Sequence, residues 1–181
     1  MILNQLETWD GTDEWVRNAF RGEGEHVQLD EGFRIYKFNS YPTLQAPGSP
    51  EWEKITAWWS PYEPYKWDAG LENRRGVAMR MGNASLRELS RIVVAVCEDW
   101  SSLRYLVQAT LTRPVYAFFG TVEPQNRFGN PVLQNRVPNS MRRWNERANH
   151  GGGRLVGLGG QFYIPNLRMA HLTDIQVTDL G

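Results

Sequence analysis

The stretch LRYLVQATLTRPVYAFFGTV, residues 103–122, predicts two consecutive β-strands and so decides the character of the fold. In its first half, Leu103, Tyr105, Val107, Ala109 and Leu111 alternate with Arg104, Leu106, Gln108 and Thr110. A period of two residues is typical of a strand. Pro114 then opens a second β segment, residues 114–122. We expect both segments to belong to the central sheet.

Helices are predicted mainly ahead of this stretch. The first runs from about Asp13 to Arg21, and the second from about Asp68 to Met81. A third opens at Ser85-Leu-Arg-Glu88, which matches a capping box. Its core-facing residues are expected to be Leu86, Leu89, Ile92, Val93 and Val96. One short helix is predicted later in the chain, around residues 140–148.

Three more segments alternate as strands do: GFRIYKFN at 32–39, QFYIP at 161–165 and TDIQVTD at 173–179. Residues 40–50 carry three prolines, which predicts an irregular loop. Residues 123–158 form a long connection with six arginines and two glutamates. The pattern predicts an α+β fold, with helices mainly in the N-terminal half and strands mainly in the C-terminal half.

The composition indicates one globular domain, residues 1–181. The chain is 41% apolar and 22% charged, which excludes a disordered or fibrous protein. Twenty basic and twenty acidic side chains cancel, so the whole molecule has no long-range field that attracts nucleic acid or an anionic membrane. No apolar run approaches the roughly twenty residues that cross a bilayer, and the first residues lack the basic start of a signal peptide.

Cysteine and histidine are sparse. Cys97 is the single cysteine and lies in the apolar run RIVVAVC, which predicts a buried thiol. His26, His150 and His171 are scattered, without the spacing of metal ligands. We therefore expect neither a zinc site nor a Cys–His nucleophile.

Three polar residues stand in apolar or aromatic surroundings. Arg34 lies within the strand FRIYKF, where a charged group needs either a ligand or a surface carboxylate as partner. Ser60 follows Trp58 and Trp59, a pair that suits either the stacking of a planar ring or ordinary core packing. Gln161 begins a strand after two glycines, which allow a close approach of the backbone to its neighbours.

The order of these residues resembles that in the bacterial mono-ADP-ribosyltransferase and NAD glycohydrolase toxin superfamily. The likeness covers residues 32–178: an arginine in the first strand, an aromatic and serine segment, and a glycine-preceded strand that ends in proline. It is closest in the ending GGQFYIPNLRMAHLTDIQV, residues 159–177. The resemblance implies a split antiparallel β-sheet core, with helices packed mainly from the N-terminal half, in a single catalytic domain.

The resemblance also implies roles for the three polar residues. Arg34 matches the arginine that binds a phosphate of NAD, and Ser60 matches the serine that orders the cleft, with Ser101 or Ser102 as rivals. Gln161 stands where the family normally has a glutamate, whose carboxylate stabilises the oxocarbenium ion as nicotinamide leaves. A glutamine keeps the hydrogen bond to the ribose but lacks the charge. One such electrostatic contact is worth about 3 kcal/mol in the transition state.

NAD is the implied substrate, with no metal. The aromatic residues expected to contact it are Tyr36, Trp59, Tyr62, Tyr163 and either Phe118 or Phe119. Cleavage can end in transfer of ADP-ribose to a macromolecule or in hydrolysis, because related NAD glycohydrolase toxins also carry glutamine after a glycine run. The alternative is a catalytically inactive module of the same fold, in which the arginine-rich residues 123–158 contact RNA or a protein.

The resemblance further implies a toxin or effector. Such a protein is expected in the cytoplasm of its producer or, after delivery, in that of a target cell. Its implied partners are NAD, a protein or nucleic-acid acceptor and an immunity protein, with no membrane among them.

Overall fold

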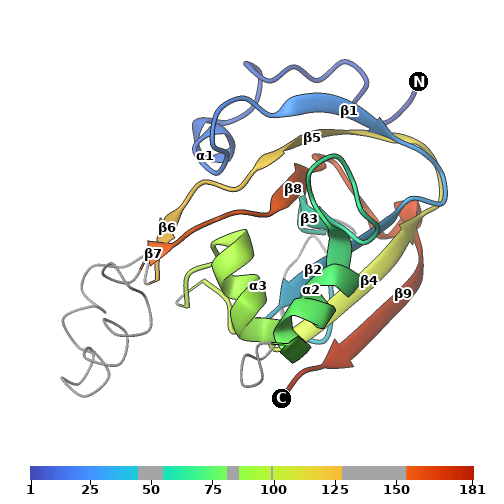
Figure 1. Cartoon of the computed structure of the whole chain (residues 1–181). Coiled ribbons are helices and arrows are strands. Elements are labelled where there is room, and N and C mark those ends of the chain that lie inside the picture. Colours follow the sequence, from blue (N-terminus) through green and yellow to red (C-terminus); the bar gives the residue numbers. More distant parts are fainter. Residues whose placement is uncertain (45–54, 81–85, 99, 128–153) are drawn as a thin grey trace.

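The computed structural model of the chain is an α+β fold built on a seven-stranded antiparallel sheet (Figure 1). It describes residues 1–44, 55–80, 86–98, 100–127 and 154–181. The strand order is β1-β5-β8-β3-β2-β4-β9. These strands are β1 Glu25–Leu29, β2 Arg34–Asn39, β3 Trp58–Pro61, β4 Tyr105–Leu111, β5 Val115–Thr121, β8 Gly160–Tyr163 and β9 Leu172–Asp179. The predicted α+β class is confirmed.

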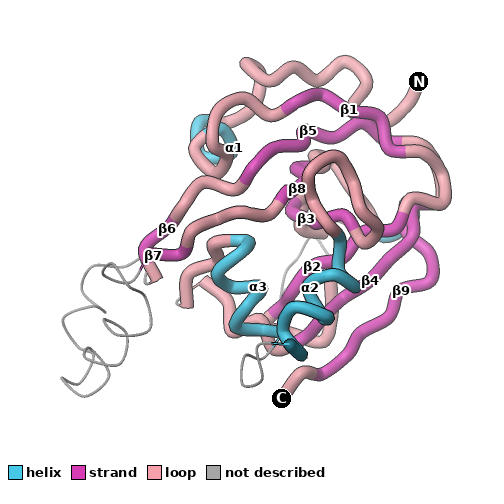
Figure 2. Tube along the Cα trace, viewed as in Figure 1, coloured by secondary structure: helices cyan, strands magenta, loops and turns pink. Residues whose placement is uncertain are grey.

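Three α-helices lie within the described residues, all ahead of β4: α1 Glu14–Arg17, α2 Gly70–Arg80 and α3 Leu86–Val94. A separate two-stranded pair joins β6, Gln125–Asn126, to β7, Arg154–Leu155. A short 3-10 turn at Met169–His171 leads into β9. Helices α2 and α3 lie together on one side of the sheet, near β2 and β4 (Figure 2).

Strand β3 changes partner along its length. Its first half, Trp58–Trp59, pairs with β8, whereas its second half, Ser60–Pro61, pairs with β2. The register of β2 with β3 therefore ends at Tyr36, and the rest of β2 continues alongside β4 alone. Figure 1 shows the result: β1 and β5 run along one end of the molecule, and β4 and β9 along another.

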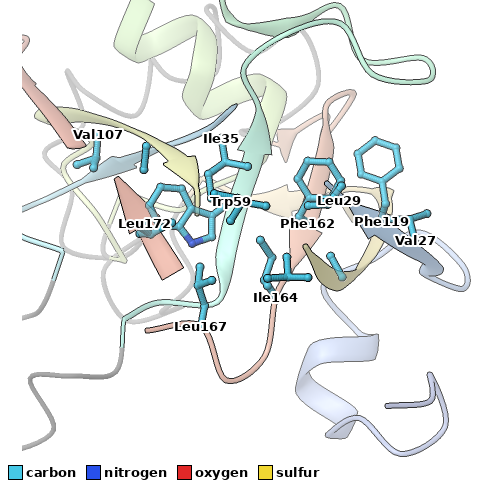
Figure 3. Close-up of a cluster of buried hydrophobic side chains, with 14 of the residues drawn as sticks. Val27, Leu29, Ile35, Trp59, Val107, Phe119, Phe162, Ile164, Leu167 and Leu172 are labelled. Carbon is cyan, nitrogen blue, oxygen red and sulfur yellow. The ribbon is translucent and has the colours of Figure 1, made fainter. Parts of the chain in front are cut away.

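Apolar residues fill both faces of the sheet. Alternation along β2 sends Ile35 into one core cluster and Tyr36 and Phe38 into another, under α2. Figure 3 shows the first cluster, in which Trp59 and Phe162 come from the neighbouring strands β3 and β8. Each of these two aromatic side chains is at most 2% exposed. The centre of the sheet is thus fixed where β2, β3 and β8 meet.

The predicted strands at 32–39, 103–111, 114–122, 161–165 and 173–179 are confirmed within a few residues. Two strands of the seven-stranded sheet, β1 and β3, were not predicted, and neither was the short pair β6 and β7. In β1, Val27 and Leu29 alternate with polar residues, but the run is short and follows the turn GEGE. In β3, prolines flank an aromatic cluster that has no clear period.

The first helix is shorter than predicted, since α1 ends at Arg17 and not near Arg21. The backbone beyond it pairs with the end of β5 instead: Phe20 bridges Val122, and the Arg21 N–H donates to the Thr121 carbonyl at 2.9 Å. Tertiary pairing overrides the local helical pattern here.

The predicted second and third helices are confirmed as α2 and α3. Met81 and the capping residue Ser85 lie outside the described residues, as do the predicted helix at 140–148 and most of the long connection. Of the residues expected to face the core, Leu86 and Val96 pack against one apolar cluster and Ile92 against another, each only partly buried, while the fully buried residues of α3 are Ser90 and Arg91. The Arg91 guanidinium donates to the carbonyls of Val96 at 2.9 Å and Ser101 at 3.0 Å.

Candidate functional site

A cavity of about 760 Å³ lies where β2 and β3 separate. Its aromatic lining residues are Trp15, Phe38, Tyr41, Trp58, Trp59 and Trp100. Polar lining comes from β3 and β8, from the end of β2, and from residues that follow β5. Mostly apolar walls with a few polar groups, in a volume of roughly 300–1,000 Å³, are typical of small-molecule sites.

Ser60 and Gln161 both line this cavity, from adjacent strands. The pairing of β3 with β8 ends at Trp59 and Phe162, and Ser60 and Gln161 are the residues next to this last pair on the two strands. The Gln161 amide Nε2 donates to the Ala19 carbonyl at 2.8 Å, which fixes the side chain and leaves its oxygen without a hydrogen bond to any described residue. Ser60 is 6% exposed, and its hydroxyl likewise has no partner in the described part of the chain. The Gln161 side-chain oxygen and the Ser60 hydroxyl are therefore both available to hydrogen-bond a ligand.

The glycines before Gln161 are required by close packing. A Cβ on Gly160 would lie 2.5 Å from Phe119 Cζ and 3.2 Å from Asp68 Cβ. A Cβ on Gly159 would lie 2.7 Å from Arg74 Nη2 and 2.8 Å from Val93 Cγ1. The predicted close approach of the backbone is confirmed.

Replacing Gly160 by alanine is expected to lower the free energy of unfolding by about 1–3 kcal/mol, because the added methyl group overlaps the buried ring of Phe119. Chemical denaturation measures the loss. Gly76→Ala is the matched control: its Cβ meets only the mobile end of Arg80, and alanine in a helix interior stabilises by roughly 0.5–1 kcal/mol. An unchanged midpoint for Gly160→Ala would contradict the packing described here.

A buried ion pair supports this glycine turn. Asp68 Oδ2 accepts hydrogen bonds from Arg74 Nη2 at 2.7 Å and from the Gly160 N–H at 2.8 Å, while Oδ1 accepts from the Gly70 N–H at 2.8 Å. Burial raises the pKa of Asp68, against the effect of the two backbone donors, and lowers the pKa of Arg74 to about 10. Arg74 therefore stays charged at neutral pH. The pair joins α2 to the first residue of β8 and so positions Gln161.

The structure does not bring Arg34 to the cavity. Its Nη1 lies 3.0 Å from Glu63 Oε1, and its guanidinium stacks 3.5 Å above the ring of Tyr62. Both charged side chains are largely exposed. Arg34 thus pairs with a surface carboxylate, the alternative to ligand binding, and Tyr62 beneath it does not line the cavity.

Of the other aromatic residues expected to contact a ligand, only Trp59 lines the cavity. Tyr36 is fully buried, with the Arg74 guanidinium 5.6 Å from its ring. Phe119, like Phe118, is a core residue. Tyr163 packs on the edge of the site, its ring 4.9 Å from that of Trp58.

Ser101 and Ser102, the alternatives to Ser60, make other contacts. Ser101 lines the cavity, but its Oγ accepts from the Leu103 N–H at 3.2 Å and shares a hydrogen bond with the Ser40 hydroxyl at 3.0 Å. Ser102 is exposed, and its backbone N–H donates to Ser40. Ser60 is therefore the serine with a hydroxyl free to meet a ligand.

Two charged residues of the cavity were not predicted. Lys37, on the face of β2 opposite to Arg34, lies with its Nζ 5.8 Å from the ring of Trp59. Burial lowers the pKa of Lys37 to about 8, and no carboxylate of the described residues forms an ion pair with it. Glu123, just beyond β5, is the other. An isolated lysine on the apolar face of FRIYKF was the available signal.

Comparisons with protein-family models, with curated proteins and with solved structures give no match. Within the part of the chain that the structure describes, no three or more histidine, cysteine or acidic side chains gather as metal ligands do. In the same residues, no helix combines the length and apolar character needed to span a membrane. Cys97 is buried, as predicted, and its thiol donates to the Asn126 carbonyl at 3.0 Å.

Proposed function

We propose that the protein cleaves the N-glycosidic bond between nicotinamide and ribose in NAD, passing ADP-ribose to water or to a macromolecule. The observation that carries the proposal is that Ser60 and Gln161, far apart in sequence, meet on adjacent strands and line one aromatic cavity. The resemblance to ADP-ribosyltransferases requires such a meeting of the arginine, serine and glutamine segments. Here these segments are β2, β3 and β8, which are neighbours in the sheet.

The chemistry of the cavity suits a pyridine dinucleotide. Trp58, which is only partly buried, offers a flat apolar surface to a planar ring, while the free oxygen of Gln161 accepts a hydrogen bond from a ribose hydroxyl. Lys37 supplies the positive charge for a diphosphate, in the place that the resemblance gives to Arg34.

Replacing Gln161 by alanine is expected to slow the release of nicotinamide by about 100-fold, because a preorganised contact to the reacting ribose is lost. Free nicotinamide released from NAD by the purified protein is the quantity to measure. The Gln161 side chain also bonds to Ala19, so the thermal midpoint is recorded alongside. The matched control is Gln176→Ala, an exposed glutamine of the edge strand β9, which should keep the full rate.

Two results would count against this function. If the wild-type protein neither binds NAD nor releases nicotinamide, the cavity serves another ligand. If it binds NAD without turnover, the inactive binding module is the better description, and a steep salt dependence would then identify nucleic acid as its partner.

A further inference from the structure

The cavity contains one acidic residue among its described lining, Glu123. It follows the end of β5, next to Val122, and it is partly buried. Two other carboxylates, neither of which lines the cavity, are held in ion pairs: Glu63 with Arg34, and Glu98 with Arg127. Glu123 forms no ion pair or side-chain hydrogen bond with a described residue. Its carboxylate is therefore available to a ligand that enters the cavity.

A shared acceptor ties Glu123 to Gln161. The backbone N–H of Glu123 donates to the Ala19 carbonyl at 3.0 Å, and the Gln161 amide donates to the same oxygen at 2.8 Å. The two residues therefore converge on one atom. Val122 holds the segment against the glycine turn, with its N–H donating to the Gly159 carbonyl at 3.1 Å. Glu123 is thus fixed beside Gln161 by backbone contacts that do not depend on its own side chain.

From this geometry we infer that Glu123 is the catalytic carboxylate of the site and supplies the negative charge that Gln161 lacks. The inference rests on the proposed NAD cleavage. Gln161 then holds a ribose hydroxyl, while Glu123 faces the positive charge that develops on the ribose. The two tasks that one glutamate performs in the resembling family are thus divided between Gln161 on β8 and Glu123 in the segment after β5.

The reaction balances with water as the only co-reactant. The bond between ribose C1′ and the pyridinium nitrogen breaks, and its electron pair leaves with nicotinamide, which becomes neutral. The positive charge passes to the ribose as an oxocarbenium ion, which the Glu123 carboxylate stabilises. Water adds to C1′ and gives up one proton, which the carboxylate accepts and returns to solvent. The products are nicotinamide, ADP-ribose and a proton.

Replacing Glu123 by glutamine tests the inference, because the two side chains have nearly the same shape. We expect kcat for nicotinamide release to fall about 100-fold, with the Kd for NAD and the thermal midpoint close to those of the wild type. Glu63→Gln is the control: it removes a carboxylate outside the cavity and should keep the full rate. Glu123→Asp retains the charge one methylene group short, and its rate should lie between those of wild type and Glu123→Gln.

A second measurement uses the coupling between the two positions. Gln161→Glu restores a carboxylate at the neighbouring strand, so it should raise the rate of Glu123→Gln by at least tenfold and that of the wild type much less. Equal gains in the two backgrounds would overturn the inference. So would a Glu123→Gln variant that turns over NAD within about threefold of the wild type, or one whose loss is explained by weaker binding. A wild type without any NAD cleavage would instead remove the proposed function.

Discussion

Asp68→Ala is expected to lower the free energy of unfolding by about 3–5 kcal/mol, enough to leave the protein close to unfolded at 37 °C. The change removes the partner of a buried guanidinium, since the side chain of Arg74 is only 7% exposed and its Nη1 already has no partner among the described residues. It also leaves the N–H groups of Gly70 and Gly160 without an acceptor. Urea denaturation followed by tryptophan fluorescence measures the loss.

Two further variants show whether the loss of stability comes from the unpaired buried charge or from breaking an ion pair as such. Asp179→Ala breaks an exposed pair with Arg104, at 2.7 Å, and should change the midpoint little because solvent screens that pair. The double variant Asp68→Ala with Arg74→Met should be more stable than Asp68→Ala alone, since it no longer buries an unpaired charge. If the double variant were the less stable of the two, the buried charge would not be the source of the loss.

Lys37→Met is expected to raise stability and to weaken NAD binding at the same time. Burial lowers the pKa of Lys37 from 10.5 to about 8, so folding at neutral pH places a partly desolvated charge inside the protein. Methionine has a similar length and removes that charge, which should stabilise the fold by about 2 kcal/mol, allowing for the side chain's partial exposure. Losing the cation should weaken binding of the NAD diphosphate by roughly tenfold or more.

The stability advantage of Lys37→Met over the wild type should decrease as the pH rises. Below pH 8 Lys37 is protonated in both the folded and the unfolded chain, and the stability advantage of Lys37→Met is at its largest. Between pH 8 and 10.5 the folded protein releases this proton while the unfolded chain keeps it, so the wild type gains stability relative to the variant. Denaturation of both proteins from pH 7 to 10 should show the difference shrinking. A constant difference would mean that Lys37 keeps an ordinary pKa.

Strands with a clear period of two were predictable from sequence, and β3 was not. The strands β2, β4 and β8 alternate because successive residues face opposite sides of the sheet; in β8, Phe162 enters the core whereas Gln161 and Tyr163 on the other face are only partly buried. Strand β3 has only four residues and divides its pairing between two neighbours. No local pattern encodes such a change of partner, since it depends on where β2 and β8 lie.

The candidate site was likewise only partly predictable from sequence. Ser60 and Gln161 were predicted from the serine beside two tryptophans and the glutamine after two glycines, and the structure brings both to one cavity. Arg34 lies at the start of β2 and pairs with Glu63, whereas the cavity is lined by the later half of the strand from Lys37 onward, and sequence alone did not show which end borders the opening. Glu123 has no motif around it, and it reaches the cavity because the end of β5 pairs with the segment after α1.

The position of β8 between β5 and β3 also governs when the cavity comes into existence. Ser60 and Gln161 are separated by about a hundred residues of chain, and closing a loop of that length is slow compared with forming a local hairpin. During synthesis the ribosome releases β3 and β5 well before β8. A nascent chain that lacks β8 therefore has an incomplete cavity. The cavity can act on a ligand only after β8 has joined the sheet between β5 and β3.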